Sequence, residues 1–279
     1  MKVSSLNIYP VKSARAVALD HARVELEGLT GDRRWVIINA DKRFISQRSH
    51  PDLARLEAAI SETGTLSLGY DGEWIDVIHL DPDVTDLTVW NDAATGHLAS
   101  DAVNDWLSDR LGERLYLVSM GEAGQRKHVN SRTGDVISVS YADGYPILIT
   151  TEASLAALND FLGETEPDLP MARFRPNIVI KGCDAWSEDS WAKIRIGGVE
   201  IDMVKPCTRC IITTLNPLTG ESEGDAAMRA MIALRRSADP ALKGVLFGMN
   251  AVPVGKGAIA VGDRVDILDR REPWPVSST

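Results

Sequence analysis

The sequence has little cysteine, no long apolar run and no apolar leader at its start. Only 3 of its 279 residues are cysteine. A disulfide framework needs an even number, so we expect a reduced, cytoplasmic protein. No apolar run reaches the roughly 18 residues of a membrane-spanning helix, so no membrane association is expected. The opening residues, MKVSSLNIYPVKSAR, lack the apolar core of a signal peptide. Together these absences predict a soluble protein.

Positive charge is scarce over the whole chain, although it is concentrated at one end. The net charge of −10 argues against a nucleic-acid-binding protein. Residues 1–50 nevertheless carry nine Lys or Arg against five acidic residues, a local charge of +4. This imbalance has two interpretations: solvated surface charge, or a site for a small anionic ligand supplied by the N-terminal segment. Composition alone leaves both open.

Turn and periodicity signals in the first part of the chain predict short strands. The apolar run at 35–38 faces Phe44 and Ile45 across a polar turn, which is typical of a hairpin. Glycines break the next apolar runs into short pieces, as in a β-barrel or sandwich. Residues 100–111 place their apolar side chains on one helical face, and Gly112 can end that helix.

The second part of the chain also favours strands, with two further helices. Residues 119–135 are polar and aperiodic, which predicts a boundary or loop. Thr151 can cap a helix over 152–162, and the pair Gly197-Gly198 between two alternating runs indicates a β-hairpin. The last expectations are a strand over 211–220, a helix from Asp225 to about residue 237, and strands over 257–268. The fold class is therefore mainly β (α+β).

Two of the cysteines, Cys207 and Cys210, form a C-x-x-C motif in the run KPCTRCIITTLNPLTG. A structural zinc is disfavoured, because only Cys183 and five scattered histidines could complete its ligands. A thioredoxin-like dithiol precedes a helix, whereas Cys210 runs into a β-branched, strand-like segment. Two interpretations remain. The cysteines pack inertly at a strand corner, or a tight turn with Lys205 and Arg209 presents Cys207 as a thiolate metal ligand.

The same run resembles the MOSC domain of molybdenum-cofactor proteins, together with FRPNIVI before it and VGDRVDIL after it. The motifs YPVKS and GDRRW are similar to those of the β-barrel domain that precedes MOSC in one branch. That branch contains the mitochondrial amidoxime-reducing component and bacterial reductases of N-hydroxylated compounds, which YADGYPILIT and FGMN also resemble. The resemblance implies a MOSC N-terminal β-barrel domain at 1–120, a MOSC β-barrel with peripheral helices at 121–271, and a tail at 272–279.

By position, the resemblance implies a role for eight residues. Cys207 matches the molybdenum ligand at the catalytic centre, and Cys210 then packs nearby. Lys12 and Ser13 of YPVKS resemble residues that hold the pterin phosphate, and Arg33 of GDRRW matches another cofactor contact. The remaining implied cofactor-lining positions are Ser140, Asp143, Arg175 and Asn250. The mitochondrial relatives have tyrosine at the position of Asn250.

The residue chemistry agrees with these implied roles. Lys12 and Arg33 lie in the one segment with excess positive charge, and both residue types suit phosphate oxygens. Other pairings stay open: Arg33 with Asp32 or Asp41, or Arg175 with a helix C-terminus. Because the implied contacts come from both parts of the chain, we expect the cofactor in a groove between them.

The resemblance implies a molybdenum-dependent reductase that binds molybdenum-molybdopterin and removes oxygen from the N–OH group of small N-oxygenated substrates. Some bacterial relatives carry a 2Fe–2S domain with four cysteines. Three cysteines cannot build it, so we expect no intrinsic 2Fe–2S cluster. Electrons then come from a separate donor of the flavin reductase, ferredoxin or cytochrome type. The alternatives are a sulfur-transfer protein with a persulfide on Cys207, or a cofactor carrier without turnover.

Overall fold

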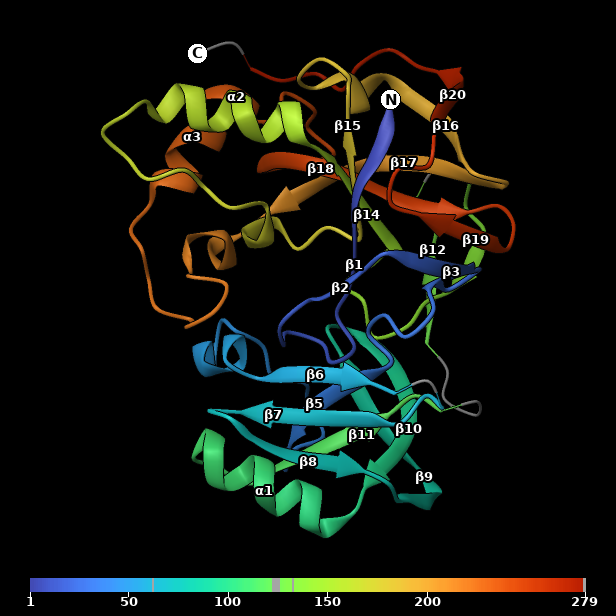
Figure 1. Ribbon diagram of the computed structural model, residues 1–279, viewed down its shortest axis with the longest axis vertical. Helices are drawn as coiled ribbons and strands as arrows, with labels where there is room; N and C mark the ends of the chain where they lie inside the picture. The colour runs from blue at the N-terminus through green and yellow to red at the C-terminus, as the bar shows by residue number, and fades with distance from the viewer. Residues whose placement is uncertain (62, 122–125, 132, 278–279) are drawn as a thin grey trace.

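The largest sheet contains eight strands and runs through the upper half of the molecule as drawn in Figure 1. A computed structural model describes residues 1–61, 63–121, 126–131 and 133–277. In spatial order the strands are β2 (Val17–Leu19), β1 (Lys2–Ile8), β15 (Ile178–Lys181), β14 (Ile147–Thr151), β18 (Val245–Pro253), β17 (Val199–Arg209), β16 (Trp191–Ile196) and β20 (Val265–Arg270). Only β14 and β15 pair in parallel; the other neighbours in this sheet are antiparallel.

The beginning of the chain is part of this upper half. β1 lies between β2 and β15, and its apolar side chains Val3, Leu6 and Ile8 are buried in the same core as the apolar residues of β15, with a register shift between Val3 and Ser5. β3 (His21–Glu25) pairs with β4 (Gly28–Leu29) and with β19 (Gly257–Ala260). Residues 2–29 are therefore hydrogen-bonded to the C-terminal part of the chain. The sequence boundary expected at residue 120 stays a prediction.

The lower half consists of residues 35–119 and has its own apolar core. One sheet has the order β5 (Trp35–Asn39), β11 (Leu115–Ser119), β10 (Asp92–Ala99) and β9 (Leu80–Val89). The other contains β6 (Glu57–Ile60), β7 (Leu66–Tyr70) and β8 (Glu73–Val77), after the short helix η1 (Pro51–Ala54). The predicted hairpin is confirmed by an antiparallel bridge between Ile38 and Phe44.

In the described part of the chain, three α-helices form where the sequence predicts them, and with the sheets above they confirm the mainly β fold with peripheral helices. α1 (Asp101–Leu111) ends at Gly112, whose φ of 81° is left-handed. α2 (Glu152–Leu162) begins after Thr151, whose Oγ1 accepts a hydrogen bond from the backbone N–H of Ser154 at 3.1 Å. α3 (Ala226–Arg235) packs beside α2 (Figure 1) and ends two residues earlier than predicted. No helix in the described ranges is long and apolar enough to cross a membrane.

The strand predicted over residues 211–220 is not formed, and this prediction is wrong. The segment begins with a short 3-10 helix, η4 (Ile211–Thr214). The hydroxyl of Thr213 donates to the carbonyl of Cys210 at 2.9 Å, and that of Thr214 donates to the carbonyl of Ile211 at 2.7 Å. Such local bonds compete with the pairing of a sheet, although the residues are β-branched. The argument that Cys210 cannot belong to a thioredoxin-like dithiol because a strand follows it therefore no longer holds.

The segment predicted as a boundary or loop, 119–135, contains a short strand. β12 (Lys127–Val129) pairs with β13 (Val136–Ser138) in a two-stranded sheet. Residues 122–125 and 132 of this prediction lie outside the described residues. Two further short helices, η2 (Met171–Phe174) and η3 (Ser187–Ser190), connect the strands of the upper half.

Candidate functional site

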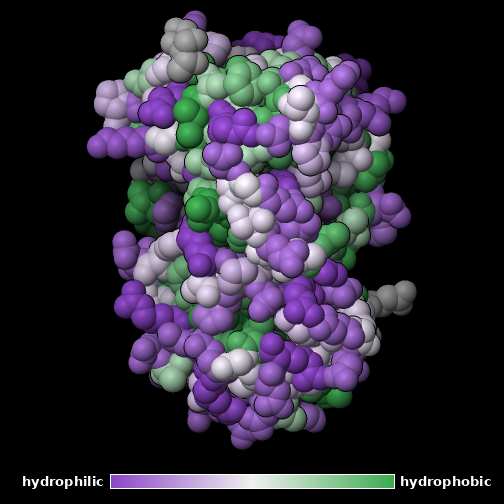
Figure 2. All heavy atoms as spheres, turned by 90° about the vertical axis from the view of Figure 1, so that its left-hand side faces the viewer, coloured by the Kyte–Doolittle hydropathy of each residue, from purple (hydrophilic) through white to green (hydrophobic). Residues whose placement is uncertain are grey.

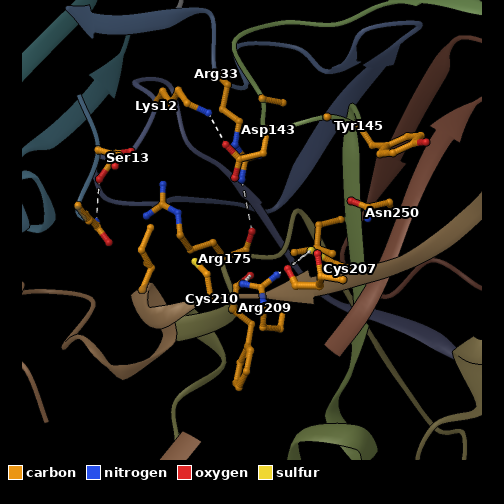
Figure 3. A pocket seen from close by; sticks show the side chains of 18 of the residues that line it. Lys12, Ser13, Arg33, Asp143, Tyr145, Arg175, Cys207, Arg209, Cys210 and Asn250 are labelled. Atoms are coloured by element: carbon orange, nitrogen blue, oxygen red, sulfur yellow. Dashed lines mark hydrogen bonds and ion pairs between the residues drawn. The ribbon is translucent and has the colours of Figure 1, made fainter. Parts of the chain in front are cut away.

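A pocket lies where the two halves meet, and both contribute to its lining (Figure 3). The loop after β1 reaches the lower half, because its residues Val11 and Ala14 belong to the lower core. Seven of the eight predicted site residues line the pocket: Lys12, Ser13, Arg33, Asp143, Arg175, Cys207 and Asn250. On the face shown in Figure 2 the surface narrows between the halves, and hydrophilic side chains predominate. The expected groove between the two parts is therefore present.

Cys207 lies near the end of β17, where its sulfur borders the pocket. A guanidinium nitrogen of Arg209, Nη1, donates to Cys207 Sγ at 3.0 Å, and Nη2 donates to the carbonyl of Phe174 at 2.8 Å. The bond to Phe174 holds the guanidinium in the position from which it contacts Cys207. Arg209 therefore aims a hydrogen-bond donor at the sulfur of Cys207. Lys205 instead stacks on the ring of Tyr145, with Nζ 5.3 Å from the ring centre.

Lys12 is buried, with only 5% of its side chain exposed, and it forms an ion pair with Asp143. The Asp143 carboxylate is 76% exposed towards the pocket. Burial lowers the pKa of Lys12, although the charge of Asp143 opposes this shift. The surrounding protein also disfavours the charge of Asp143, but Lys12 outweighs this and holds the pKa of that carboxyl below its usual range. Lys12 is thus a cation shielded from water, and its anionic partner is Asp143, which lines the pocket.

Two more guanidinium groups stack on one aromatic ring beside the pocket. The Cζ atoms of Arg33 and Arg175 lie 4.6 and 4.2 Å from the ring centre of Tyr9. Arg33 Nη1 also donates to Asp32 at 2.6 Å and to Asn177 Oδ1 at 3.2 Å. Burial lowers the pKa of Arg175 to about 10 and raises the pKa of Tyr9 to about 12. Arg33 therefore has the alternative partner Asp32, yet its side chain still borders the pocket.

The backbone around the pocket is strained in a way that is rare elsewhere in the described chain. Of the seven non-glycine residues with positive φ, four line the pocket: Ser13 (71°), Arg33 (49°), Trp90 (58°) and Arg175 (55°). Each such conformation costs about 1–3 kcal/mol and persists only where the surrounding structure imposes it. Strain concentrated in this way is typical of functional sites.

Two families match the chain one after the other. Residues 1–114 match the MOSC N-terminal beta barrel domain, and residues 137–266 match the MOSC domain. The chain is 33% identical to human mitochondrial amidoxime-reducing component 1 over 95% of its own length and 82% of that protein's length. It belongs to the MOSC-domain family. Mouse component 1 and human component 2 are 31% and 29% identical, over 95% and 94% of this chain and 82% of each relative.

One predicted site residue of this MOSC-domain protein, Ser140, does not line the pocket. Its side chain is buried, and its Oγ has no hydrogen-bond partner among the described residues. Its carbonyl accepts from the buried Arg126 at 3.2 Å, and Arg126 also donates to the carbonyl of Asp143 at 3.1 Å and to Asp92 at 2.8 Å. Arg126 thereby holds the segment that carries Asp143. Nothing in the sequence marked Arg126, because it lies in the segment predicted as a loop.

The lining fits an anionic ligand that brings its own metal. Five cationic side chains and one carboxylate, Asp143, border the pocket; the cations are Lys12, Arg33, Arg48, Arg175 and Arg209. Within the described ranges, no group of three or more His, Cys, Asp or Glu could hold a metal ion. A metal at Cys207 would therefore take one thiolate from the protein and its other ligands from a bound organic group. This donor set fits a phosphate-bearing molybdenum cofactor in a MOSC-domain protein.

Proposed function

We propose that this chain is a molybdenum-cofactor-binding oxidoreductase that reduces N-hydroxylated compounds with electrons from a separate redox partner. The observation that carries the proposal is the presence of Cys207 and the cationic residues Lys12, Arg33 and Arg175 in one pocket. The names of the relatives, which are amidoxime-reducing components, support this substrate class. Molybdenum supplies, when bound, the two-electron chemistry that removes oxygen from an N–OH group.

The chain's own residues bind and orient the cofactor. Lys12, Arg33 and Arg175 bind its phosphate, because buried or stacked cations gain most from a charge-assisted hydrogen bond. Cys207 supplies the thiolate ligand, and Arg209 directs its sulfur through the 3.0 Å contact. Asn250 Nδ2 donates to the carbonyl of the residue before Cys207 at 3.3 Å, which fixes the backbone at the ligand.

Electrons reach the site from another protein. A 2Fe–2S cluster needs four ligands, usually cysteines, and this chain has three cysteines. We propose a donor of the flavin reductase, ferredoxin or cytochrome type. Purified protein should therefore reduce benzamidoxime with such a donor but not with NADH alone.

The first test is the molybdenum content per chain of protein made in a host that synthesises the cofactor. Wild type and Cys210→Ala should carry nearly one molybdenum, whereas Cys207→Ala should lose most of it. Cys210→Ala is the matched control, because it removes a thiol from the same motif. Absence of molybdenum from all three proteins would contradict the proposal and direct attention to a persulfide on Cys207. Bound molybdenum without reduction by any donor would indicate a cofactor carrier.

A further inference from the structure

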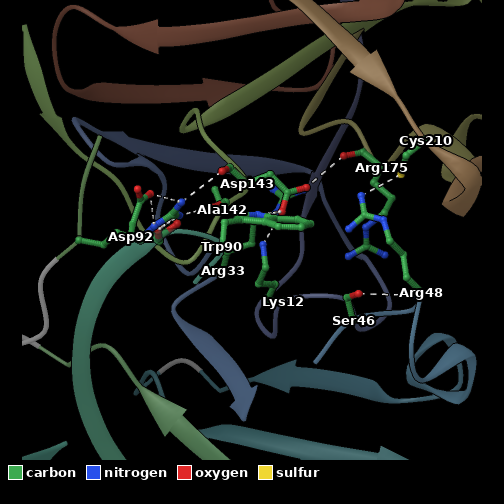
Figure 4. Close-up of polar contacts among 12 residues, drawn as sticks. Lys12, Arg33, Ser46, Arg48, Trp90, Asp92, Ala142, Asp143, Arg175 and Cys210 are labelled. Atoms are coloured by element: carbon green, nitrogen blue, oxygen red, sulfur yellow. Dashed lines mark hydrogen bonds and ion pairs between the residues drawn. The ribbon is translucent and has the colours of Figure 1, made fainter. Parts of the chain in front are cut away.

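Arg48 is a cation of the pocket that forms no ion pair with the described residues. Its Nη2 lies 3.0 Å from Cys210 Sγ, and its Cζ lies 4.8 Å from the ring centre of Trp90 (Figure 4). A cysteine sulfur is a weak acceptor, and an aromatic face attracts a cation without neutralising it. Lys12, by contrast, is paired with Asp143. The charge of Arg48 and most of its N–H donors are therefore available to a ligand.

Trp90 beside it occupies a backbone position that suits other residues. Val89 pairs with Asp92, so Trp90 is the first residue of a two-residue hairpin turn between β9 and β10, and its φ is 58°. Glycine, asparagine or aspartate usually fills such a position. The side chain is 38% exposed, and its Nε1 donates to Asp143 Oδ1 at 3.1 Å. A strained turn thus presents a planar indole, fixed by Asp143, at the pocket.

Phe44 supports this indole from one side. Its ring packs edge-on against Trp90 with the ring centres 4.8 Å apart. Arg48 is the exposed cation at Trp90, and the buried Lys12 lies near Phe44, with its Nζ 5.0 Å from the ring centre of Phe44. Because Lys12 contacts Asp143 and is assigned above to the cofactor phosphate, Arg48 is the cation on this surface that remains for the anionic group of a second ligand.

We propose that Arg48 and Trp90 form a subsite for the anionic group of a planar ligand. The guanidinium of Arg48 binds a carboxylate or phosphate group through paired N–H donors, and the indole of Trp90 stacks on the conjugated part. The inference rests on the proposed reductase function, because it names the substrates of that reaction. These are planar N-hydroxylated compounds that carry an acidic substituent. Uncharged analogues lose the contact with Arg48 and bind more weakly.

The direct test compares benzoate with benzamide, two planar probes of nearly equal shape that differ in charge. Ligand-observed NMR titrations of the purified protein should give about tenfold tighter binding of benzoate, as expected for a hydrogen bond to a charged group. Arg48→Gln should remove this preference. Arg43→Gln removes the same charge from an exposed position that does not line the pocket. This control variant should retain the preference for benzoate. The preference should also shrink at high salt, because Arg48 is exposed.

The second measurement uses turnover by the molybdenum-loaded protein. The ratio of kcat/KM for 4-carboxybenzamidoxime to that for benzamidoxime should fall about tenfold in Arg48→Gln and not in Arg43→Gln. Equal benzoate binding by wild type and Arg48→Gln would overturn the subsite. Selective loss of molybdenum from Arg48→Gln would also overturn it, because Arg48 would then belong to the cofactor's binding site.

The two proposals fail in different ways. If the proteins bind benzoate preferentially but reduce neither substrate with any donor, the reductase function is wrong and the anion subsite stands. If they reduce both substrates without discrimination, the subsite is wrong and the reductase function stands.

Discussion

The Lys12–Asp143 pair is asymmetric, because one partner is buried and the other is exposed. Lys12→Met removes the buried charge, leaves an apolar side chain beside Phe44 and Trp90, and leaves Asp143 in contact with water. We expect this variant to be as stable as wild type or about 1 kcal/mol more stable. It should also lose bound molybdenum. Urea unfolding and metal analysis of the same samples measure both effects.

The matched variant, Asp143→Asn, should have the opposite effect on stability. It leaves Lys12 buried without a counter-charge and should reduce the free energy of unfolding by about 1–3 kcal/mol. Burial lowers the pKa of Lys12, so its folded form releases the proton more easily than its unfolded form. The stability of wild type relative to Lys12→Met should therefore rise as the pH increases through that lowered pKa. Equal destabilisation by both substitutions would contradict this account.

The sequence identified most of the pocket through motifs, but it missed residues whose partners are distant in the chain. Arg48 contacts a cysteine 162 positions away, and Trp90 contacts an aspartate 53 positions away. No local pattern reports such pairs, and Arg48 entered the prediction only as part of the N-terminal charge excess. The strained φ of Trp90 is equally invisible, because tryptophan gives no turn signal.

At the scale of elements, predictions held where the signal was local. The apolar periodicity and caps of α1 and α2, and the glycine pair between β16 and β17, specify their structures without help from the rest of the chain. The pairing of β1 with β15 joins residues as far apart in the chain as Lys2 and Lys181 and has no such signal. η4 was missed because threonine hydroxyls bonded to the local backbone instead of leaving it to a sheet.

A buried carboxylate that contacts the start of α2 should make stability depend on pH. Glu188 of η3 is 1% exposed and accepts hydrogen bonds from Ser154 Oγ at 2.7 Å and Thr151 Oγ1 at 3.2 Å. Burial raises the pKa of Glu188, so its folded form holds the proton more tightly than its unfolded form. The resulting stabilisation is present below the unfolded pKa of about 4.3 and is lost as the pH rises through the folded pKa.

Glu188→Gln should therefore match wild type near pH 4 and be the more stable protein at pH 7.5. Urea unfolding over this pH range measures the difference. Asp189→Asn serves as the control: Asp189 pairs with the buried Arg235 at 2.7 Å, so its loss should destabilise the protein at neutral pH. A difference between Glu188→Gln and wild type that does not change with pH would refute the assignment.

At the scale of the whole molecule, the halves seen in space do not follow the order of the chain. The core of the upper half includes Val3, Leu6, Ile8, Ala22, Val24 and Leu29 from the first thirty residues. The larger of these side chains each contribute about 1.5–3 kcal/mol by burial. Their combined contribution is comparable to the roughly 5–15 kcal/mol of net stability of a typical domain.

A fragment of residues 121–279 should therefore not fold alone, although it contains the whole match to the MOSC domain. Circular dichroism during urea unfolding should show no cooperative transition for this fragment. Co-expression with residues 1–120 should restore the transition, because it returns β1 and β3. Cooperative unfolding of the isolated fragment would contradict the prediction.

The position of β1 also has a consequence for synthesis on the ribosome. Lys2–Ile8 leaves the ribosome long before its partner β15, which begins only at Ile178. At about 5–20 residues per second, roughly 10–30 s pass before that partner is made. The lower half, residues 35–119, can fold during this interval, while an apolar strand with unpaired backbone groups stays exposed. The newborn protein is thus most prone to aggregate at a strand whose apolar side chains will later be buried in its largest core.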